Sequence, residues 1–237
     1  PLTAVVVKAT GNGWSGYWHA LSNPSTAAAL RLTIGQAVLV TIVNVVMGTL
    51  VAWVLVRDDF AGKAVLDLVI DVPFALPTIV AGLVLLSLYG PDSPVGLHFA
   101  NTRVGIFIAL LFVTVPFVVR AVQPVLLELD RDVEEAAASL GASRTTIFRR
   151  IVLPNLAPAI AAGTALCFAR AVSEYGSLVL ISGNLPFRTE VAAVRILSLN
   201  ENDNPAGAAA VASVLLVVAV VALLSIDGLR RWAVRRA

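Results

Sequence analysis

Five long stretches with few charged side chains dominate this 237-residue sequence, and they constrain its fold more than any other feature. A helix needs about 20 apolar residues to cross the hydrocarbon core of a membrane. Only 14% of the residues are charged and the mean hydropathy is +0.88, whereas soluble domains carry about 25% charged residues. We therefore predict an all-α, polytopic bundle of transmembrane helices. The predicted spans are residues 34–56, 68–90, 104–119, 156–181 and 206–226.

The sequence indicates a single membrane domain over residues 1–237, because no repeat or flexible linker divides it. Pro73 and Pro77 predict a kinked or partly unwound second span. The chain begins with proline inside an apolar stretch that lacks the basic segment of a signal peptide. We expect this stretch to belong to a truncated sixth span. We also expect residues 190–199 to form a short lateral helix between the last two spans.

The distribution of lysine and arginine predicts the orientation, because short loops rich in these residues stay in the cytoplasm. Of the 17 lysines and arginines, eleven fall on the side that includes the C-terminal tail, five fall on the other side and Arg170 lies inside a span. The C-terminus is therefore expected in the cytoplasm. The scattered distribution also argues against a nucleic-acid partner, which would need one basic patch.

The cytoplasmic segment between the third and fourth spans is longer than most loops, and its pattern predicts two short helices. Asp132 and Glu135 have the spacing of an N-terminal cap, and Gly141 is placed to end the first helix. Ser143 would begin the second helix and Pro154 would stop it. An amphipathic pair of this kind either lies in the lipid interface or docks on a partner.

Seven positions in this segment combine an acidic residue, small residues, a glycine and a later apolar stretch with proline: Glu135, Ala136, Ala137, Gly141, Ile151, Leu153 and Pro154. In residue type and spacing they match the EAA signature of ABC-type importer permeases, and the segment resembles that family for this reason. The resemblance implies the ABC type I importer (MetI-like) permease fold, in which residues 120–157 form a coupling helix pair that docks on a separate ATPase. Glu135 would either offer its charge to that partner or cap its own helix.

The resemblance also implies the partners of the chain. Two ATP-binding subunits would hold ATP and magnesium, a second similar permease would complete the pore, and a periplasmic or lipid-anchored protein would deliver the substrate. The chain itself lacks the G-x-x-x-x-G-K-[ST] sequence that cradles nucleotide phosphates. We therefore expect a transport subunit of a bacterial inner membrane that is not itself an enzyme and holds no cofactor of its own.

Three further stretches extend the resemblance over most of the chain, and they look like the sulfate and thiosulfate permease subunits of the CysT type. These stretches are residues 71–78, 168–177 and 181–190. The implied cargo is sulfate or thiosulfate. Molybdate permeases share the pattern of residues 168–177, so a molybdate or tungstate importer is the alternative. An ion-gradient-driven transporter would need no ATPase, and the helix pair argues against it.

Two charged residues, Arg170 and Glu174, interrupt the fourth predicted span. They are four positions apart, so on one helix they would share a face and form an ion pair. One interpretation is a structural pair, and the other places Arg170, Glu174 and Ser177 along the route of the anion. The single cysteine and the two histidines form no metal-binding or catalytic pattern.

Overall fold

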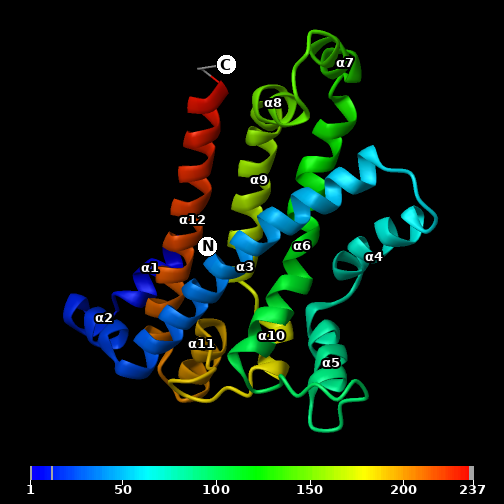
Figure 1. The fold of residues 1–237 in the computed structure, drawn as a ribbon. Coiled ribbons are helices and arrows are strands. Elements are labelled where there is room, and N and C mark those ends of the chain that lie inside the picture. The colour runs from blue at the N-terminus through cyan, green and yellow to red at the C-terminus, as the bar shows by residue number, and fades with distance from the viewer. Residues whose placement is uncertain (1, 12, 235–237) are drawn as a thin grey trace.

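The computed structural model describes residues 2–11 and 13–234, and every regular element in these ranges is a helix (Figure 1). This confirms the predicted all-α class. One of the elements, η1, is a five-residue π-helical turn between α8 and α9. The elements are α1 Leu2–Ala9, α2 Gly13–Ser22, α3 Pro24–Arg57, α4 Lys63–Ala75, α5 Thr78–Tyr89, α6 Arg103–Glu128, α7 Arg131–Ser139, α8 Arg144–Ile147, η1 Phe148–Val152, α9 Leu153–Val172, α10 Gly176–Ile181, α11 Ala192–Glu201 and α12 Pro205–Val234.

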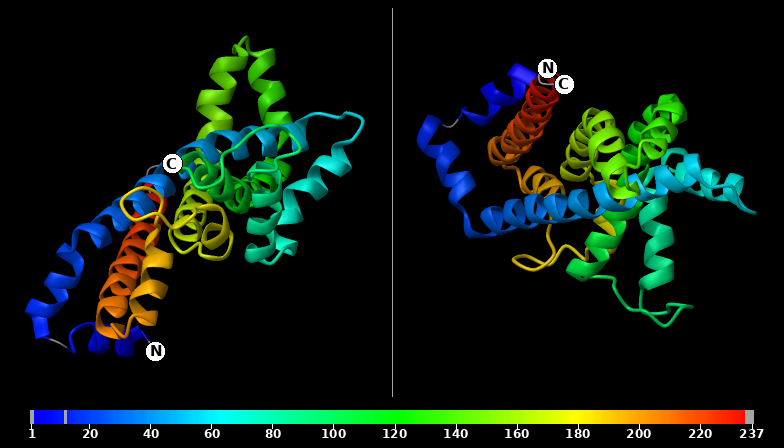
Figure 2. Two further views of the ribbon diagram at one scale, coloured as in Figure 1. Left: turned by 90° about the horizontal axis from the view of Figure 1, so that it is seen from below. Right: turned by 45° about the horizontal axis from the view of Figure 1, so that its top comes forward.

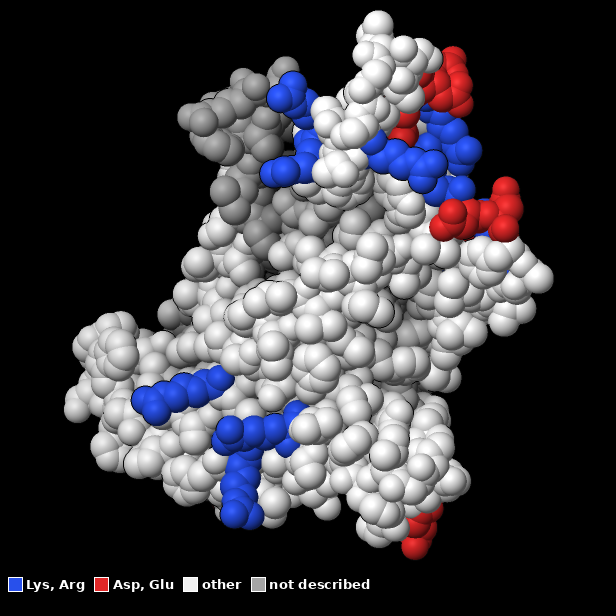
Figure 3. Space-filling view, in the orientation of Figure 1, with Lys and Arg blue, Asp and Glu red and all other residues white. Residues whose placement is uncertain are grey.

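Within the described part of the chain, four helical segments are long and apolar enough to cross a membrane. They are α3, α6, the continuous helix Arg144–Val172 and residues Pro205–Ser225 of α12. The pair α4 and α5 forms a fifth crossing if the two helices are taken together, and it bends by 115° next to Pro77. The predicted kink in the second span is therefore confirmed. Figure 3 shows an uncharged band on one face of the molecule, between two ends that carry charged side chains.

The helix α3 crosses the other long helices obliquely and packs against α6 and α9 (Figures 1 and 2). Close approach is possible because small residues lie at the crossings: Gly48 of α3 faces Val118 of α6, and Gly163 of α9 faces the same turn. The apolar core forms two main clusters, one in each half of the bundle. The single cysteine, Cys167, is fully buried in one of them, as a small apolar residue would be.

The fourth span differs from the prediction, because the helix does not continue to residue 181. The helix α9 ends at Val172, and a short break precedes α10. The helix therefore ends two residues before Glu174, which lies in the break. No proline lies in this break. Backbone groups that the break leaves without helical hydrogen bonds are instead bonded by nearby side chains.

The half-helices α5 and α10, each of which follows a break, pack against each other through two glycines. A Cβ atom on Gly176 would overlap the Thr78 hydroxyl and lie 2.8 Å from the amide nitrogen of Ile79. A Cβ atom on Gly82 would lie 2.7 Å from the carbonyl oxygen of Ser177. Both neighbours include backbone atoms that cannot move aside independently. The two breaks can therefore lie in contact because Gly82 and Gly176 carry no side chains.

Replacing Gly176 by alanine is expected to destabilise the protein by about 1–3 kcal/mol, because an added methyl group in a packed interior forces the backbone to shift. The matched control is Gly35→Ala in α3, where an added Cβ would meet no atom within 4 Å. Thermal unfolding of the purified complex in detergent measures the difference. Equal stability of the two variants would contradict the close packing of α5 and α10.

The N-terminal helices and α11 surround the first turns of α12 at the end of the bundle opposite α7 and α8 (Figures 1 and 2). The lateral helix predicted at 190–199 is present as α11, shifted by two residues. The apolar stretch near the N-terminus forms α1, which packs on α12. The truncated sixth span expected there stays a prediction.

Candidate functional site

The segment that carries the EAA-like residues projects from one end of the bundle as two short helices, and the last turns of α12 lie at the same end (Figure 1). The first helix, α7, is capped by Asp130, whose carboxylate accepts a hydrogen bond of 2.9 Å from the amide of Asp132. The cap predicted at Asp132 is therefore wrong by two residues. The reason is that the helix begins at Arg131, which leaves Asp132 inside its first turn.

Gly141 ends α7 in a Schellman turn, which confirms its predicted role as the C-terminal cap. Its φ of +84° lies in the left-handed region, which side chains with a Cβ rarely adopt. The amide of Gly141 donates to the carbonyl of Ala138 at 2.9 Å, and the amide of Ala142 donates to the carbonyl of Ala137 at 3.0 Å. These two bonds satisfy carbonyl groups at the end of α7 and turn the chain sharply toward α8.

The second helix begins as predicted, because the Ser143 hydroxyl accepts a hydrogen bond from the amide of Thr146. It does not stop at Pro154, as the sequence suggested. The chain widens into η1 and continues without interruption into α9. Pro154 lies near the N-terminal end of α9, just after the π-helical turn, where the wider turn separates its ring from the preceding carbonyl groups. The second helix of the pair is therefore a direct extension of a membrane-spanning helix.

The seven EAA-like residues lie on the outside of this extension. Of these residues, Ala137 and Ile151 are partly buried and the other five are exposed. Large apolar side chains are exposed beside them, with Leu140 89% and Val133 50% accessible. A cluster of small and apolar side chains at a projecting tip is a surface that a partner protein can bury.

The helix pair is held to the last turns of α3 by contacts that no sequence pattern predicts. Arg57 forms an ion pair with Glu134 of α7, and its guanidinium lies 5.5 Å from the ring centroid of Trp53. Trp53 in turn packs edge-on against Phe148 of η1, with ring centroids 5.8 Å apart. We call these four residues the α3 clamp. The acidic residue involved is Glu134, adjacent to the predicted Glu135, which remains exposed.

Arg120 forms a second ionic cluster. The predicted end of the third span at residue 119 is wrong for this residue, because α6 continues beyond it to Glu128. Its guanidinium donates to the carboxylates of Asp67 and Asp71 on α4, with nitrogen to oxygen distances of 2.7–2.8 Å. The two aspartates are four residues apart and share a face of α4, so one arginine reaches both. This pairing joins the first half of the bent span to α6.

The predicted pair of Arg170 and Glu174 is confirmed at 2.6 Å, and Ser177 belongs to the same cluster. The Glu174 carboxylate accepts hydrogen bonds of 2.8 Å from both the amide and the hydroxyl of Ser177. The side chain of Glu174 is fully buried, whereas that of Arg170 is 29% exposed. Glu174 therefore joins the end of α9 to the first turn of α10 across the break.

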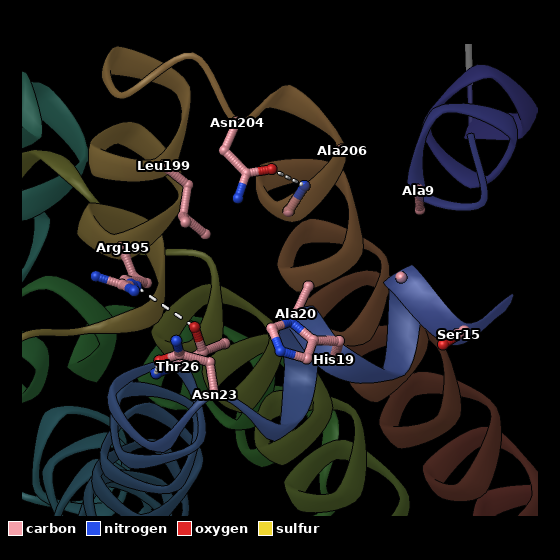
Figure 4. A pocket seen from close by; sticks show the side chains of 12 residues that line it. Ala9, Ser15, His19, Ala20, Asn23, Thr26, Arg195, Leu199, Asn204 and Ala206 are labelled. Carbon is pink, nitrogen blue, oxygen red and sulfur yellow. Dashed lines mark hydrogen bonds between the residues drawn. The ribbon is translucent and has the colours of Figure 1, made fainter. Parts of the chain in front are cut away.

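A cavity of about 400 Å³ lies at the opposite end, between α2, α3, α11 and α12 (Figure 4). Arg195 lies at its edge and donates to the Thr26 hydroxyl at 3.4 Å. Burial raises the pKa of the neighbouring Glu190 carboxyl, although the Arg195 guanidinium, 3.7 Å away, opposes this effect. None of the site residues predicted from the sequence lines this cavity.

Comparison with known proteins covers nearly the whole chain. The family model described as "Binding-protein-dependent transport system inner membrane component" matches residues 44–237. The sulfate transport system permease protein CysT of Synechocystis is 45% identical over 100% of this chain and 85% of its own length. The protein of the same name from Escherichia coli K12 is 43% identical over 100% of this chain and 88% of its own.

Two solved structures have the same fold. A chain of a bacterial alginate ABC transporter, in complex with a periplasmic protein that carries an alginate pentasaccharide, aligns with a TM-score of 0.80 at 16% identity and covers 98% of this chain and 87% of its own. A chain of the MetNI methionine ABC transporter aligns with a TM-score of 0.68 at 17% identity, over 90% of this chain and 99% of its own. The predicted MetI-like permease fold is therefore confirmed.

Proposed function

Because this chain belongs to the family of binding-protein-dependent transport system inner membrane components, we propose that it is the permease subunit of an ABC-type importer that moves sulfate across the inner membrane. The observation that carries this proposal is the projecting helix pair. Its small and apolar residues are exposed, its turn is fixed by Gly141, and it continues directly into a membrane-spanning helix. Force applied to the pair by a partner would reach the membrane helices directly.

The choice of sulfate rests on the full-length similarity to sulfate transport permeases at 43–45% identity. Thiosulfate has the same tetrahedral shape and charge, so it is included in the proposed substrate class. Molybdate and tungstate remain the alternative cargo for the same mechanism. The projecting helix pair disfavours an ion-gradient-driven transporter, because such a protein has no ATPase partner for the pair to contact.

The proposed partners follow from the same fold. Two ATP-binding subunits would receive the helix pair and would hold ATP and magnesium, so hydrolysis takes place outside this chain. A second, similar permease would complete the route, and a periplasmic or lipid-anchored protein would deliver the anion to the end formed by α2 and α11. The helix pair and the end of α12 then face the cytoplasm, as the excess of lysine and arginine on that side supports.

The test is uptake of labelled sulfate into a strain that lacks its own sulfate permease and expresses this chain with its neighbouring transport genes. We expect energy-dependent uptake that excess molybdate barely reduces. Uptake that molybdate suppresses, or no sulfate uptake by an assembled complex, would move the cargo to molybdate or another oxyanion. Uptake that continues when the ATP-binding subunits are omitted would contradict the ABC mechanism itself.

We propose that Arg170 acts structurally, by neutralising the buried carboxylate of Glu174 at the break between α9 and α10. Arg170→Ala is expected to reduce uptake about tenfold while the complex still assembles, because it leaves a buried carboxylate without its ionic partner. Adding Glu174→Gln removes that unpaired charge, and uptake should then recover. Persistent loss in the double variant, measured with the same labelled sulfate, would place Arg170 on the anion route instead.

A further inference from the structure

The end of the bundle opposite the helix pair carries a second open cavity, of about 360 Å³, between α3, α6 and the loop that precedes α11. Arg31 of α3 and Arg103 of α6 line it, together with Gln36 and Phe187. No acidic residue is among the described residues that line it. Within the described part of the chain, Arg31 and Arg103 form no ion pair with any acidic residue. Two cationic side chains therefore share one hollow without a protein counter-charge.

The loop that forms the wall of this cavity is held in a fixed shape. The carbonyl of Leu185 accepts hydrogen bonds from the amides of Arg188, Thr189 and Glu190, at 2.9–3.1 Å. The Arg188 carbonyl in turn accepts a hydrogen bond of 3.1 Å from Nε of Arg103. This bond uses only one edge of the Arg103 guanidinium, so its other nitrogens stay available to a ligand.

Phe187 shows that this shape is not explained by packing alone. Its φ is +63°, a left-handed conformation that is rare for a bulky side chain and costs about 1–3 kcal/mol. The side chain is also 60% exposed, so burial does not offset that cost. Strain that the fold maintains without a gain in packing is typical of functional positions. Here it holds the aromatic ring at the edge of the arginine-lined cavity.

We propose that Arg31, Arg103 and Gln36 form a receiving site for a doubly charged tetrahedral oxyanion at the outer mouth of the permease. Guanidinium groups bind such oxyanions through paired hydrogen bonds, and the Gln36 amide adds a neutral donor. The site is open to solvent, so it binds weakly. Weak binding suits an entry site, which must concentrate the anion and also release it. The identity of the anion as sulfate rests on the proposed function.

Chemical protection of the arginines tests this site without relying on transport. The purified complex, without its binding protein, is treated with phenylglyoxal, which modifies accessible arginines, and the modification at each position is followed by mass spectrometry. We expect millimolar sulfate to slow the modification of Arg31 and Arg103 several-fold. Chloride at the same ionic strength should not do so.

Variants make the test specific. Arg31→Gln should abolish sulfate protection of Arg103, and Arg103→Gln should abolish protection of Arg31, whereas Lys8→Gln removes an exposed charge elsewhere and should change neither.

Absence of protection in a complex that still imports sulfate would overturn the site and leave the proposed function intact. Arginines that do not react even without sulfate would also overturn it. If the complex imports only molybdate, molybdate replaces sulfate as the protecting anion in the same experiment. The test of the site then does not depend on which oxyanion is the cargo.

Discussion

Replacing Gly141 by aspartate is expected to lower ATP-driven uptake about tenfold or more, the factor that corresponds to roughly 1.4 kcal/mol of lost docking free energy. A new Cβ at this position would meet no atom within 4 Å, so the substitution is sterically open. The φ of +84° costs most side chains conformational energy, but aspartate and asparagine tolerate this region best. The main effect is therefore a new negative charge on a surface that a partner must bury.

Gly141→Asn is the matched control, because asparagine has nearly the same size and the same tolerance of the left-handed region without the charge. It should keep most of the uptake. The labelled-sulfate assay gives the loss, and co-purification of the ATP-binding subunits shows whether docking has failed. Equal loss in the two variants would assign the effect to the backbone turn, and full activity of Gly141→Asp would exclude the turn from the docking surface.

The parts of the fold that follow from hydropathy and from proline were predictable, and the positions of helix ends inside the membrane were not. Pro77 marks the bend between α4 and α5, because proline lacks an amide donor and clashes with the preceding turn, whereas Pro73 lies inside α4 without interrupting it. The break before α10 carries no such signal. It exists because the carboxylate of Glu174 satisfies the amide of Ser177, and hydrogen bonds formed by one side chain leave no periodic pattern in the sequence.

In the helix pair, too, some features were predictable from the sequence and others were not. Gly141 was predictable, because a glycine after an amphipathic run is the common end of a helix. Pro154 misled the prediction because a π-helical turn next to it lets the chain continue as one helix, and the residue pattern does not distinguish a stop from a widened turn. The ionic partners of Arg57 and Arg120 lie 77 and 49–53 residues away, so only the fold brings them together.

The α3 clamp has a consequence for how motion would reach the membrane. It joins α7 through Glu134 and η1 through Phe148, so both halves of the helix pair contact the last turns of one membrane-spanning helix. The side chains of Arg57 and Glu134 are only 10% and 21% exposed, and a partly buried pair of this kind is worth about 1–3 kcal/mol when one partner is lost. The clamp therefore connects docking at the helix pair to displacement of α3.

Reversing one charge of the clamp, by Arg57→Glu or Glu134→Arg, is expected to reduce uptake about tenfold while ATP hydrolysis by the assembled complex continues, since roughly 1.4 kcal/mol of coupling is lost. Combining the two substitutions restores opposite charges and should recover most of the uptake. Recovery should be incomplete, because a glutamate at the C-terminal end of α3 opposes the helix dipole. Uptake and ATP hydrolysis are measured on the same preparations, which separates loss of coupling from loss of assembly.

Lys63→Glu provides the matched control for the clamp. Its ion pair with Asp59 lies just beyond the end of α3, joins two residues four positions apart, and leaves the Asp59 side chain 99% exposed. An exposed ion pair is worth about 0–1 kcal/mol, so uptake should stay close to that of the unmodified protein. If Lys63→Glu and Arg57→Glu reduced uptake equally, the effect would come from charge at this end of the molecule. If the double reversal failed to recover uptake while assembly stayed intact, Arg57 and Glu134 would not transmit motion as a pair.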